Sequence, residues 1–169
     1  MKRIALLSIM MLIALCSQAQ IYSSEAYFYL EAGKSITDKR ESNWKIVKFK
    51  GNKIFTTSTS LSKIDAELRR NPNYYEGKGL DGCSELTYNS SLSTSSEYVY
   101  SGSTWAYTME DPIYGYINPS TFYYKAVFNK DNSTLKWYLK DEKDSDYKVW
   151  YFVRVPKSEV LPVSNGFIE

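Results

Sequence analysis

The stretch that decides the fold runs from Phe122 to Val155 and reads FYYKAVFNKDNSTLKWYLKDEKDSDYKVWYFVRV. Apolar residues alternate with other residues in three segments of it, and two polar turns, 129–132 and 141–146, separate these segments. A period of two is typical of β-strands, and Asn, Asp and Ser favour turns. The stretch therefore predicts a three-stranded antiparallel meander.

Both faces of the last of these segments, 148–155, carry large apolar side chains. A sheet covered on one side would leave one set of them in water, so we expect the sheet to curl, or to be covered on both faces. Trp137 shares its face with Leu135 and Leu139. Because side chains on one face of a strand point the same way, this row predicts that Trp137 belongs to the core.

Further strands are predicted before this meander. Trp44–Lys50 and Lys53–Thr59 flank Gly51-Asn52, a pair that favours a tight hairpin turn. Ser101-Gly102-Ser103 is interpreted as a second turn. The other expected strands are Ala26–Glu31 and, with weaker patterns, Glu85–Tyr88, Glu97–Ser101 and Trp105–Met109.

One segment has the pattern of a helix. Ser62 is a suitable N-cap, Ile64 and Leu68 lie on one helical face, and Asn71-Pro72 ends the pattern. No second core or linker is evident, so residues 20–169 are predicted to form a single domain. We expect a mainly β fold: an antiparallel meander of about six to eight strands, forming a barrel or a sandwich, with one short helix.

Residues 1–19 have the composition of an export signal. Two cations precede the apolar run Ile4–Leu15, and small residues at positions 17 and 19 fit cleavage after Ala19. The run is shorter than the roughly 20 residues that a membrane anchor needs. The sequence therefore predicts a periplasmic or secreted protein of a Gram-negative bacterium. Lipid attachment at Cys16 is the less favoured alternative.

Charge and residue types exclude several classes of function. Lys2 and Arg3 account for the whole excess of 21 basic over 19 acidic residues, so the mature chain gives no electrostatic reason to bind nucleic acid or an anionic membrane. The sequence contains no histidine, which excludes Ser-His-Asp and Cys-His catalysis and His-ligated metals. After signal removal Cys83 has no disulfide partner, and its role stays open. No cofactor is expected.

Aromatic residues are abundant: 16 Tyr, 7 Phe and 4 Trp. Tyr and Trp join a flat apolar ring to a polar tip, which suits stacking on sugars or packing at a protein interface, although packing within the sheet explains the same residues. Trp105 and Tyr107 alternate on one predicted strand face and are expected to form an anchor pair. The candidate ligand-binding residues are Trp105, Tyr107, Tyr98, Tyr100, Tyr114 and Tyr116.

Two segments resemble a known group of proteins. FYYKAVFNKDNSTLKWYLKDE (122–142) and YFVRVPKSEVLP (151–162) resemble the C-terminal end of small, uncharacterised exported bacterial proteins, and SNWKIVKFKGNKIF (42–55) is a weaker match. The resemblance implies a shared β-rich fold and export, and it carries no activity or site residue. The meander is also similar in architecture to lipocalin-like barrels, although the short glycine-tryptophan signature near the first strand is absent.

We therefore expect an exported, non-catalytic β-domain that binds a glycan, a small apolar molecule or a protein through aromatic residues. A structural or inhibitory interaction protein is one alternative. A histidine-free glycoside hydrolase is another, because two carboxyl groups about 5–5.5 or 6.5–9.5 Å apart suffice for that chemistry. The sequence does not place any two of its acidic candidates together: Glu31, Glu76, Glu85, Glu97, Glu110 and Asp111.

Overall fold

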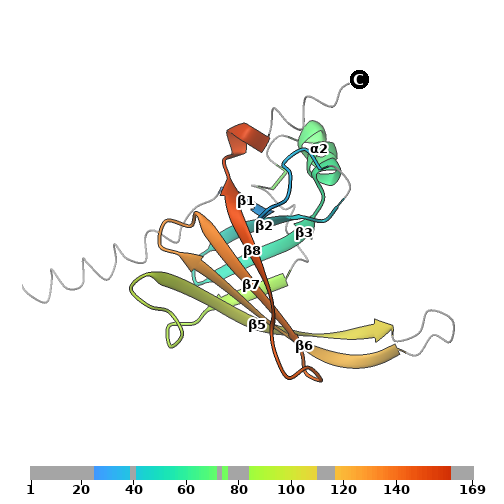
Figure 1. Cartoon of the computed structure of the whole chain (residues 1–169), viewed down its shortest axis with the longest axis vertical. Coiled ribbons are helices and arrows are strands. Elements are labelled where there is room, and N and C mark those ends of the chain that lie inside the picture. The colour runs from blue at the N-terminus through green and yellow to red at the C-terminus, as the bar shows by residue number, and fades with distance from the viewer. Residues whose placement is uncertain (1–24, 39–40, 72–73, 76–83, 110–116, 161–169) are drawn as a thin grey trace, which may run out of the picture.

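The sheet closes on itself. In the computed structural model, eight strands of the described chain follow one another in sequence order around an antiparallel barrel, and the last strand pairs with the first (Figure 1). The structure describes residues 25–38, 41–71, 74–75, 84–109 and 117–160, with the backbone alone at 107–109 and 117–119. The expected export signal, 1–19, lies outside these ranges.

The strands follow the predicted order. They are β1 (Ala26–Glu31), β2 (Trp44–Lys50), β3 (Lys53–Thr59), β4 (Ser84–Tyr88), β5 (Glu97–Met109), β6 (Ile117–Asn129), β7 (Thr134–Asp141) and β8 (Lys148–Val155). The helix α2 (Leu61–Arg70) joins β3 to β4. The mainly β meander with one short helix is thus confirmed, and of the two predicted architectures the barrel is the one that forms.

An aromatic cluster fills one end of the barrel, near the β2–β3 and β6–β7 turns. The ring centroid of Phe49 lies 5.8 Å from that of Tyr100 and 5.2 Å from that of Phe128. Tyr29 is fully buried, and its hydroxyl donates a hydrogen bond of 2.9 Å to the carbonyl oxygen of Asn132. Trp137 is 6% exposed and belongs to the same cluster, as predicted. We call this part of the interior the filled end.

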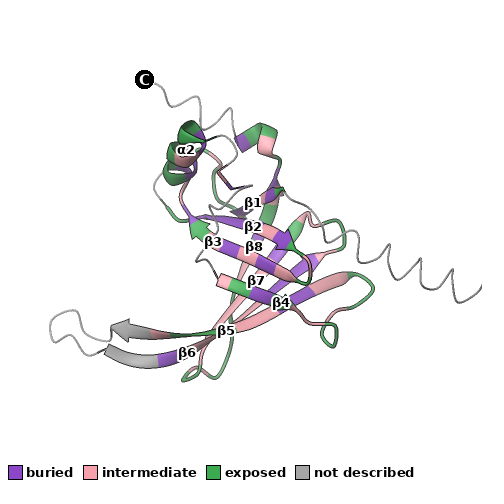
Figure 2. Cartoon of the chain, turned by 180° about the vertical axis from the view of Figure 1, so that it is seen from behind, coloured by how far each residue is buried: buried purple, intermediate pink, exposed green. Residues whose placement is uncertain are grey.

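Helix α2 buries the outer face of β1 and β2. Ile64 and Leu68 pack in one cluster with Phe28 and Trp44. Both faces of β2 are therefore covered, and Figure 2 shows most of that strand as buried. The helix begins at Leu61 after the N-cap Ser60, so the predicted cap at Ser62 is wrong by two residues.

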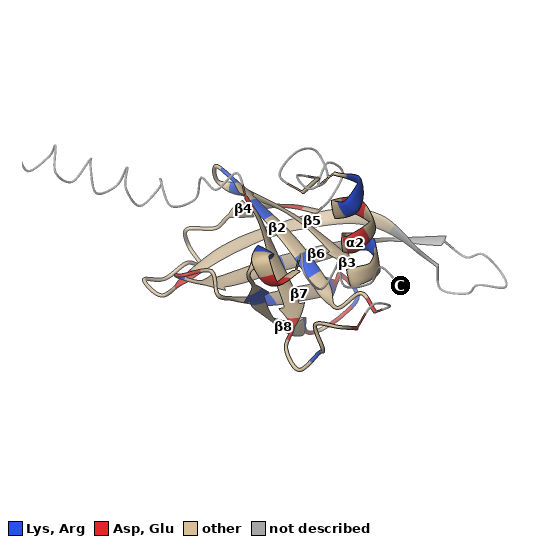
Figure 3. Cartoon of the chain, turned by 90° about the horizontal axis from the view of Figure 1, so that it is seen from above, with Lys and Arg blue, Asp and Glu red and all other residues tan. Residues whose placement is uncertain are grey.

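Acidic and basic residues are interspersed around the described surface (Figure 3).

The hairpin of β5 and β6 projects beyond its neighbours (Figure 1). Its pairing is continuous from Glu97 with Asn129 to Met109 with Ile117, whereas β7 accompanies β6 only along 122–128. The turn predicted at Ser101-Gly102-Ser103 is therefore wrong, because these residues lie within β5.

Gly102 lets β4 and β5 approach each other closely; it does not form a turn. A Cβ at this position would lie 2.9 Å from Cδ2 of Leu86 and 3.0 Å from the carbonyl oxygen of Glu85. These contacts are shorter than van der Waals distance, so the absence of a side chain lets β4 pack tightly against β5.

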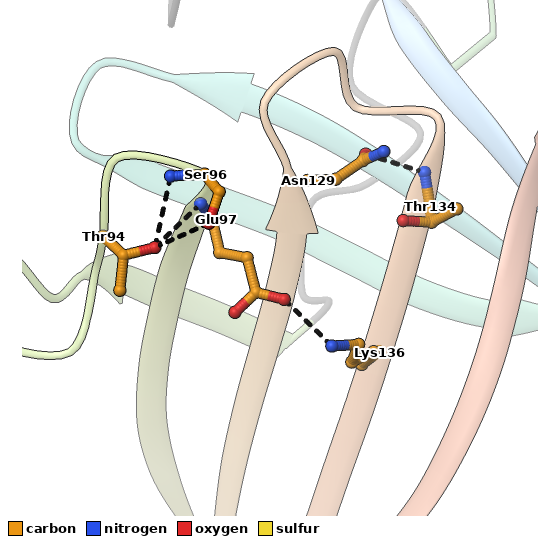
Figure 4. A network of polar contacts seen from close by, with 6 residues as sticks. All are labelled: Thr94, Ser96, Glu97, Asn129, Thr134 and Lys136. Carbon is orange, nitrogen blue, oxygen red and sulfur yellow. Dashed lines mark hydrogen bonds and ion pairs between the residues drawn. The ribbon is translucent and has the colours of Figure 1, made fainter.

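Polar contacts fix the start of β5 and the β6–β7 turn (Figure 4). The Oγ1 of Thr94 accepts a hydrogen bond of 3.1 Å from the N–H of Glu97, and Oδ1 of Asn129 accepts one of 2.9 Å from the N–H of Thr134. On the outer surface the Nζ of Lys136 lies 2.9 Å from Oε1 of Glu97 and links β7 to β5 across β6. These contacts hold the register from which the projecting hairpin extends.

Candidate functional site

The end of the barrel away from the filled end is hollow. Two adjoining pockets of about 390 and 200 Å3 share Lys45, Ser58, Trp137 and Leu139 in their walls, and we call them together the Lys45 cavity. The larger pocket falls within the range of about 300–1,000 Å3 that is typical of small-molecule sites. Its remaining lining residues are Thr56, Thr57, Ser84 and Tyr124. Those of the smaller pocket are Glu31, Ser42, Trp150 and Phe152.

Strand register gives this cavity two unlike walls. On β2, β3 and β4, Lys45 stands opposite Ser58, and Thr56 stands opposite Ser84. On β6, β7 and β8, Tyr124 stands opposite Leu139, and Trp137 stands opposite Trp150. Because residues paired across a ladder share a face of the sheet, the first group forms a polar wall and the second an aromatic wall.

Lys45 is the charged residue of the polar wall, and it is buried. Its side chain is 5% exposed, its Nζ donates a hydrogen bond of 2.9 Å to Oγ of Ser58, and the same nitrogen lies 3.7 Å from the ring centroid of Trp137. Within the described chain no carboxylate is paired with it. Burial lowers the pKa of Lys45 to about 7, because a low-polarity environment disfavours the ammonium form.

Thr56 supplies a second polar group to this wall. The residue is 2% exposed and lines the larger pocket, and its hydroxyl makes no hydrogen bond to any residue that the structure describes. A buried hydroxyl without a partner costs about 1–3 kcal/mol.

The aromatic wall is built from rings in contact. The ring centroids of Tyr124 and Trp137 are 5.7 Å apart at an interplanar angle of 47°. Trp150 is paired with Trp137 and packs partly buried against the aromatic cluster of the filled end. Burial raises the pKa of the Tyr124 phenol, which therefore stays neutral at ordinary pH. The wall is thus flat, apolar and uncharged.

Comparison with protein-family models, curated proteins and solved structures found no match. In the part of the chain that the structure describes, no helix is long and apolar enough to cross a membrane. Nor, in that part, do three or more Cys, Asp or Glu side chains gather as they would around a metal ion.

The acidic candidates do not form a pair in the cavity. Among the described lining residues Glu31 is the one carboxylate. Glu85 is ion-paired with Lys53, and Glu97 with Lys136, on the outer surface. The other acidic candidates lie outside the described residues: Glu76, Glu110 and Asp111.

The aromatic candidates lie in different places. Tyr98 and Tyr100 face the filled end, where Tyr100 is 1% exposed and burial raises its pKa. Trp105 is 59% exposed on the projecting hairpin, and strand alternation places it on the opposite face of β5. Tyr107 follows on the same face as Trp105, with only its backbone described. Tyr114 and Tyr116 lie beyond the described ranges.

Neither Lys45 nor Thr56 was among the residues predicted for the site. A signal for Lys45 is nevertheless present, since Lys45 has the same strand parity as Val47 and Phe49, which are buried in the aromatic cluster. A lysine in phase with two core residues is expected to point inward unless the strand contains a bulge. Thr56 lies on β3 in phase with Ile54, another residue of that cluster.

Proposed function

We propose that the protein is an exported, non-catalytic barrel that binds a small amphipathic molecule in the Lys45 cavity. The observation that carries this proposal is the contrast between the two sides of the cavity: a buried lysine and a buried threonine lie opposite four aromatic rings and a leucine. Small-molecule sites combine these elements, with apolar rings for affinity and a few polar groups for orientation.

Binding without turnover is favoured over glycoside hydrolysis. Hydrolysis of a glycosidic bond uses two carboxyl groups on opposite sides of the bond, and Glu31 stands as the single carboxylate of the described cavity lining. The sequence also contains no histidine to serve as a general base.

A neutral fluorescent probe tests the proposal. N-phenyl-1-naphthylamine gains fluorescence in apolar sites, and we expect one molecule to bind per barrel. Leu139→Trp would fill the cavity, because Leu139 lines both pockets, and should weaken binding at least tenfold. Trp105→Phe on the projecting hairpin is the control and should bind as the wild type does. Binding that survives Leu139→Trp, or no binding to the wild type, would overturn the proposal.

Export rests on the N-terminal sequence and has its own test. Expression in a Gram-negative host followed by intact-mass measurement should give a chain that begins at Gln20. A chain that begins at Cys16 with added lipid, or one that keeps residues 1–19, would contradict this part of the proposal.

A further inference from the structure

The polar wall of the larger pocket presents hydrogen-bond donors and a cation. Lys45 and Ser58 are joined by the 2.9 Å hydrogen bond, and Thr56 lies two residues from Ser58 on the same strand face, about 7 Å away at the ordinary strand rise. All three residues line this pocket. Glu31 does not, because it belongs to the smaller pocket. The larger pocket therefore has a cationic wall with no carboxylate among its described lining residues.

Among the described residues, the buried amine of Lys45 has no carboxylate to form an ion pair with. Buried charges in proteins are normally paired, and an isolated one is costly. The ring of Trp137 faces the ammonium group at 3.7 Å and stabilises its charge in part, but it has no negative atom to accept a hydrogen bond. Ser58 provides a neutral acceptor. An anion in the larger pocket would complete the pair.

We propose that the ligand of the Lys45 cavity is a planar aromatic acid, whose carboxylate binds at Lys45 and whose ring lies against Trp137 and Tyr124. This inference rests on the proposed function and adds the chemical class of the ligand. The shape of the ring follows from the wall on β6 to β8, where Tyr124, Trp137 and Leu139 offer flat apolar surface opposite the donors.

Binding of an aromatic acid should be coupled to uptake of a proton by Lys45. A bound carboxylate keeps Lys45 protonated, whereas burial in the free protein lets the amine lose its proton near pH 7. Other ionisable groups of the described lining are Glu31 from β1 and the phenol of Tyr124 from β6; the lining residues from β3, β7 and β8 do not ionise. Above pH 7 the affinity for an acid should therefore fall by up to tenfold per pH unit.

Two matched compounds test whether the cavity recognises a carboxylate. 2-Naphthoate and 2-naphthamide share ring and size, and only the first carries a charge. We expect the wild type to prefer naphthoate at least tenfold at pH 6 and to lose most of that preference by pH 9. Calorimetry in two buffers of different ionisation enthalpy should show close to one proton taken up per naphthoate bound at pH 8.5, and none per naphthamide.

Variants separate charge from shape. Lys45→Met should bind both compounds equally and without pH dependence. Lys45→Arg is the matched control: it should keep the preference for naphthoate at pH 9, because a guanidinium stays charged.

Equal binding of the two compounds to the wild type, or no proton uptake, would overturn the inference and leave the proposed function standing. Preference for 2-naphthylmethylamine would also overturn it and would assign recognition to Glu31. Failure to bind these compounds and N-phenyl-1-naphthylamine alike would remove both the inference and the proposed function.

Discussion

The side-chain nitrogen of Lys45 lies 3.7 Å from the ring centroid of Trp137, inside the barrel. A cation over a tryptophan face away from water gains about 2 kcal/mol. The contact joins the one lysine among the buried residues of the described chain to a tryptophan of the aromatic cluster. Stability and protonation of the barrel are therefore coupled at this pair of residues.

The first prediction is that stability rises with pH through Lys45. The folded pKa is about 7 and the ordinary value is 10.5, so between these values the unfolded chain holds more protons than the folded one. The free energy of unfolding should then increase from about pH 7 to 9.5, by at most about 1.4 kcal/mol per pH unit. Urea unfolding followed by circular dichroism measures it, and Lys45→Met should remove this rise.

The predicted rise in the free energy of unfolding ends at about pH 9.5 because two buried tyrosines oppose it at higher pH. Burial raises the pKa of Tyr29 and Tyr100 above the usual value of 10, so their contribution to stability is lost as the pH rises beyond that value. A wild-type stability that stays flat or falls between pH 7 and 9.5 would contradict the first prediction.

The second prediction compares two tryptophans. Trp137→Ala should lower the free energy of unfolding by about 3–5 kcal/mol, because the ring is 6% exposed and its loss leaves a large cavity. Trp105→Ala, at a residue that is 59% exposed, should change it by less than about 1 kcal/mol. In addition, iodide should quench a fluorescence component that disappears in Trp105→Phe. A change below 1 kcal/mol for Trp137→Ala would be incompatible with its place in the cluster.

The third prediction concerns the close approach at Gly102. Gly102→Ala should destabilise the barrel by about 1–3 kcal/mol, because the new methyl group would meet Leu86 at 2.9 Å. Ser103→Ala is the control on the next residue, which is exposed, and should change stability by less than about 0.5 kcal/mol. Equal unfolding midpoints for both variants would show that β4 can move away without cost.

The fourth prediction tests whether α2 is part of the core. Ile64 is fully buried against the outer face of β1 and β2, so Ile64→Ala should cost about 2–5 kcal/mol. Lys63→Ala alters an exposed neighbour in the same helix and should cost less than about 0.5 kcal/mol. If thermal unfolding of the two variants coincided, the helix would be an appendage rather than a cover for the sheet.

Much of the sheet was predictable because its signals are local. The bounds of β1, β2 and β3 coincide with the predicted ones, since strand alternation and the turn at Gly51, with a φ of 61°, are properties of neighbouring residues. The turn predicted at Gly102 is wrong for the opposite reason. A glycine favours a turn by its own preference, but here its role depends on Leu86, a residue of another strand.

The candidate site was harder to predict than the fold. Tyr100 and Trp105 were expected together as binding residues, yet one faces the filled end and the other lies on the projecting hairpin. Lys45 was not among the predicted binding residues. Lysine is usually exposed, but the phase of Lys45 with Val47 and Phe49 indicates an inward position. The barrel is full at one end and hollow at the other because of the combined side-chain volumes of eight strands. The sequence of any one strand does not predict this sum.

The seam between β1 and β8 governs how the chain reaches its native state. Phe28 pairs with Val155, so closure joins the first described strand to the last. Contacts between distant parts of a chain are slow to form, and barrels built on them fold in milliseconds to seconds. A truncated chain that lacks β8 would keep two unpaired strand edges, which are templates for aggregation. Pairing of β8 with β1, rather than formation of any hairpin, is therefore the event that closes these two edges of the barrel wall, whereas β6 extends beyond its pairing with β7 at the projecting hairpin.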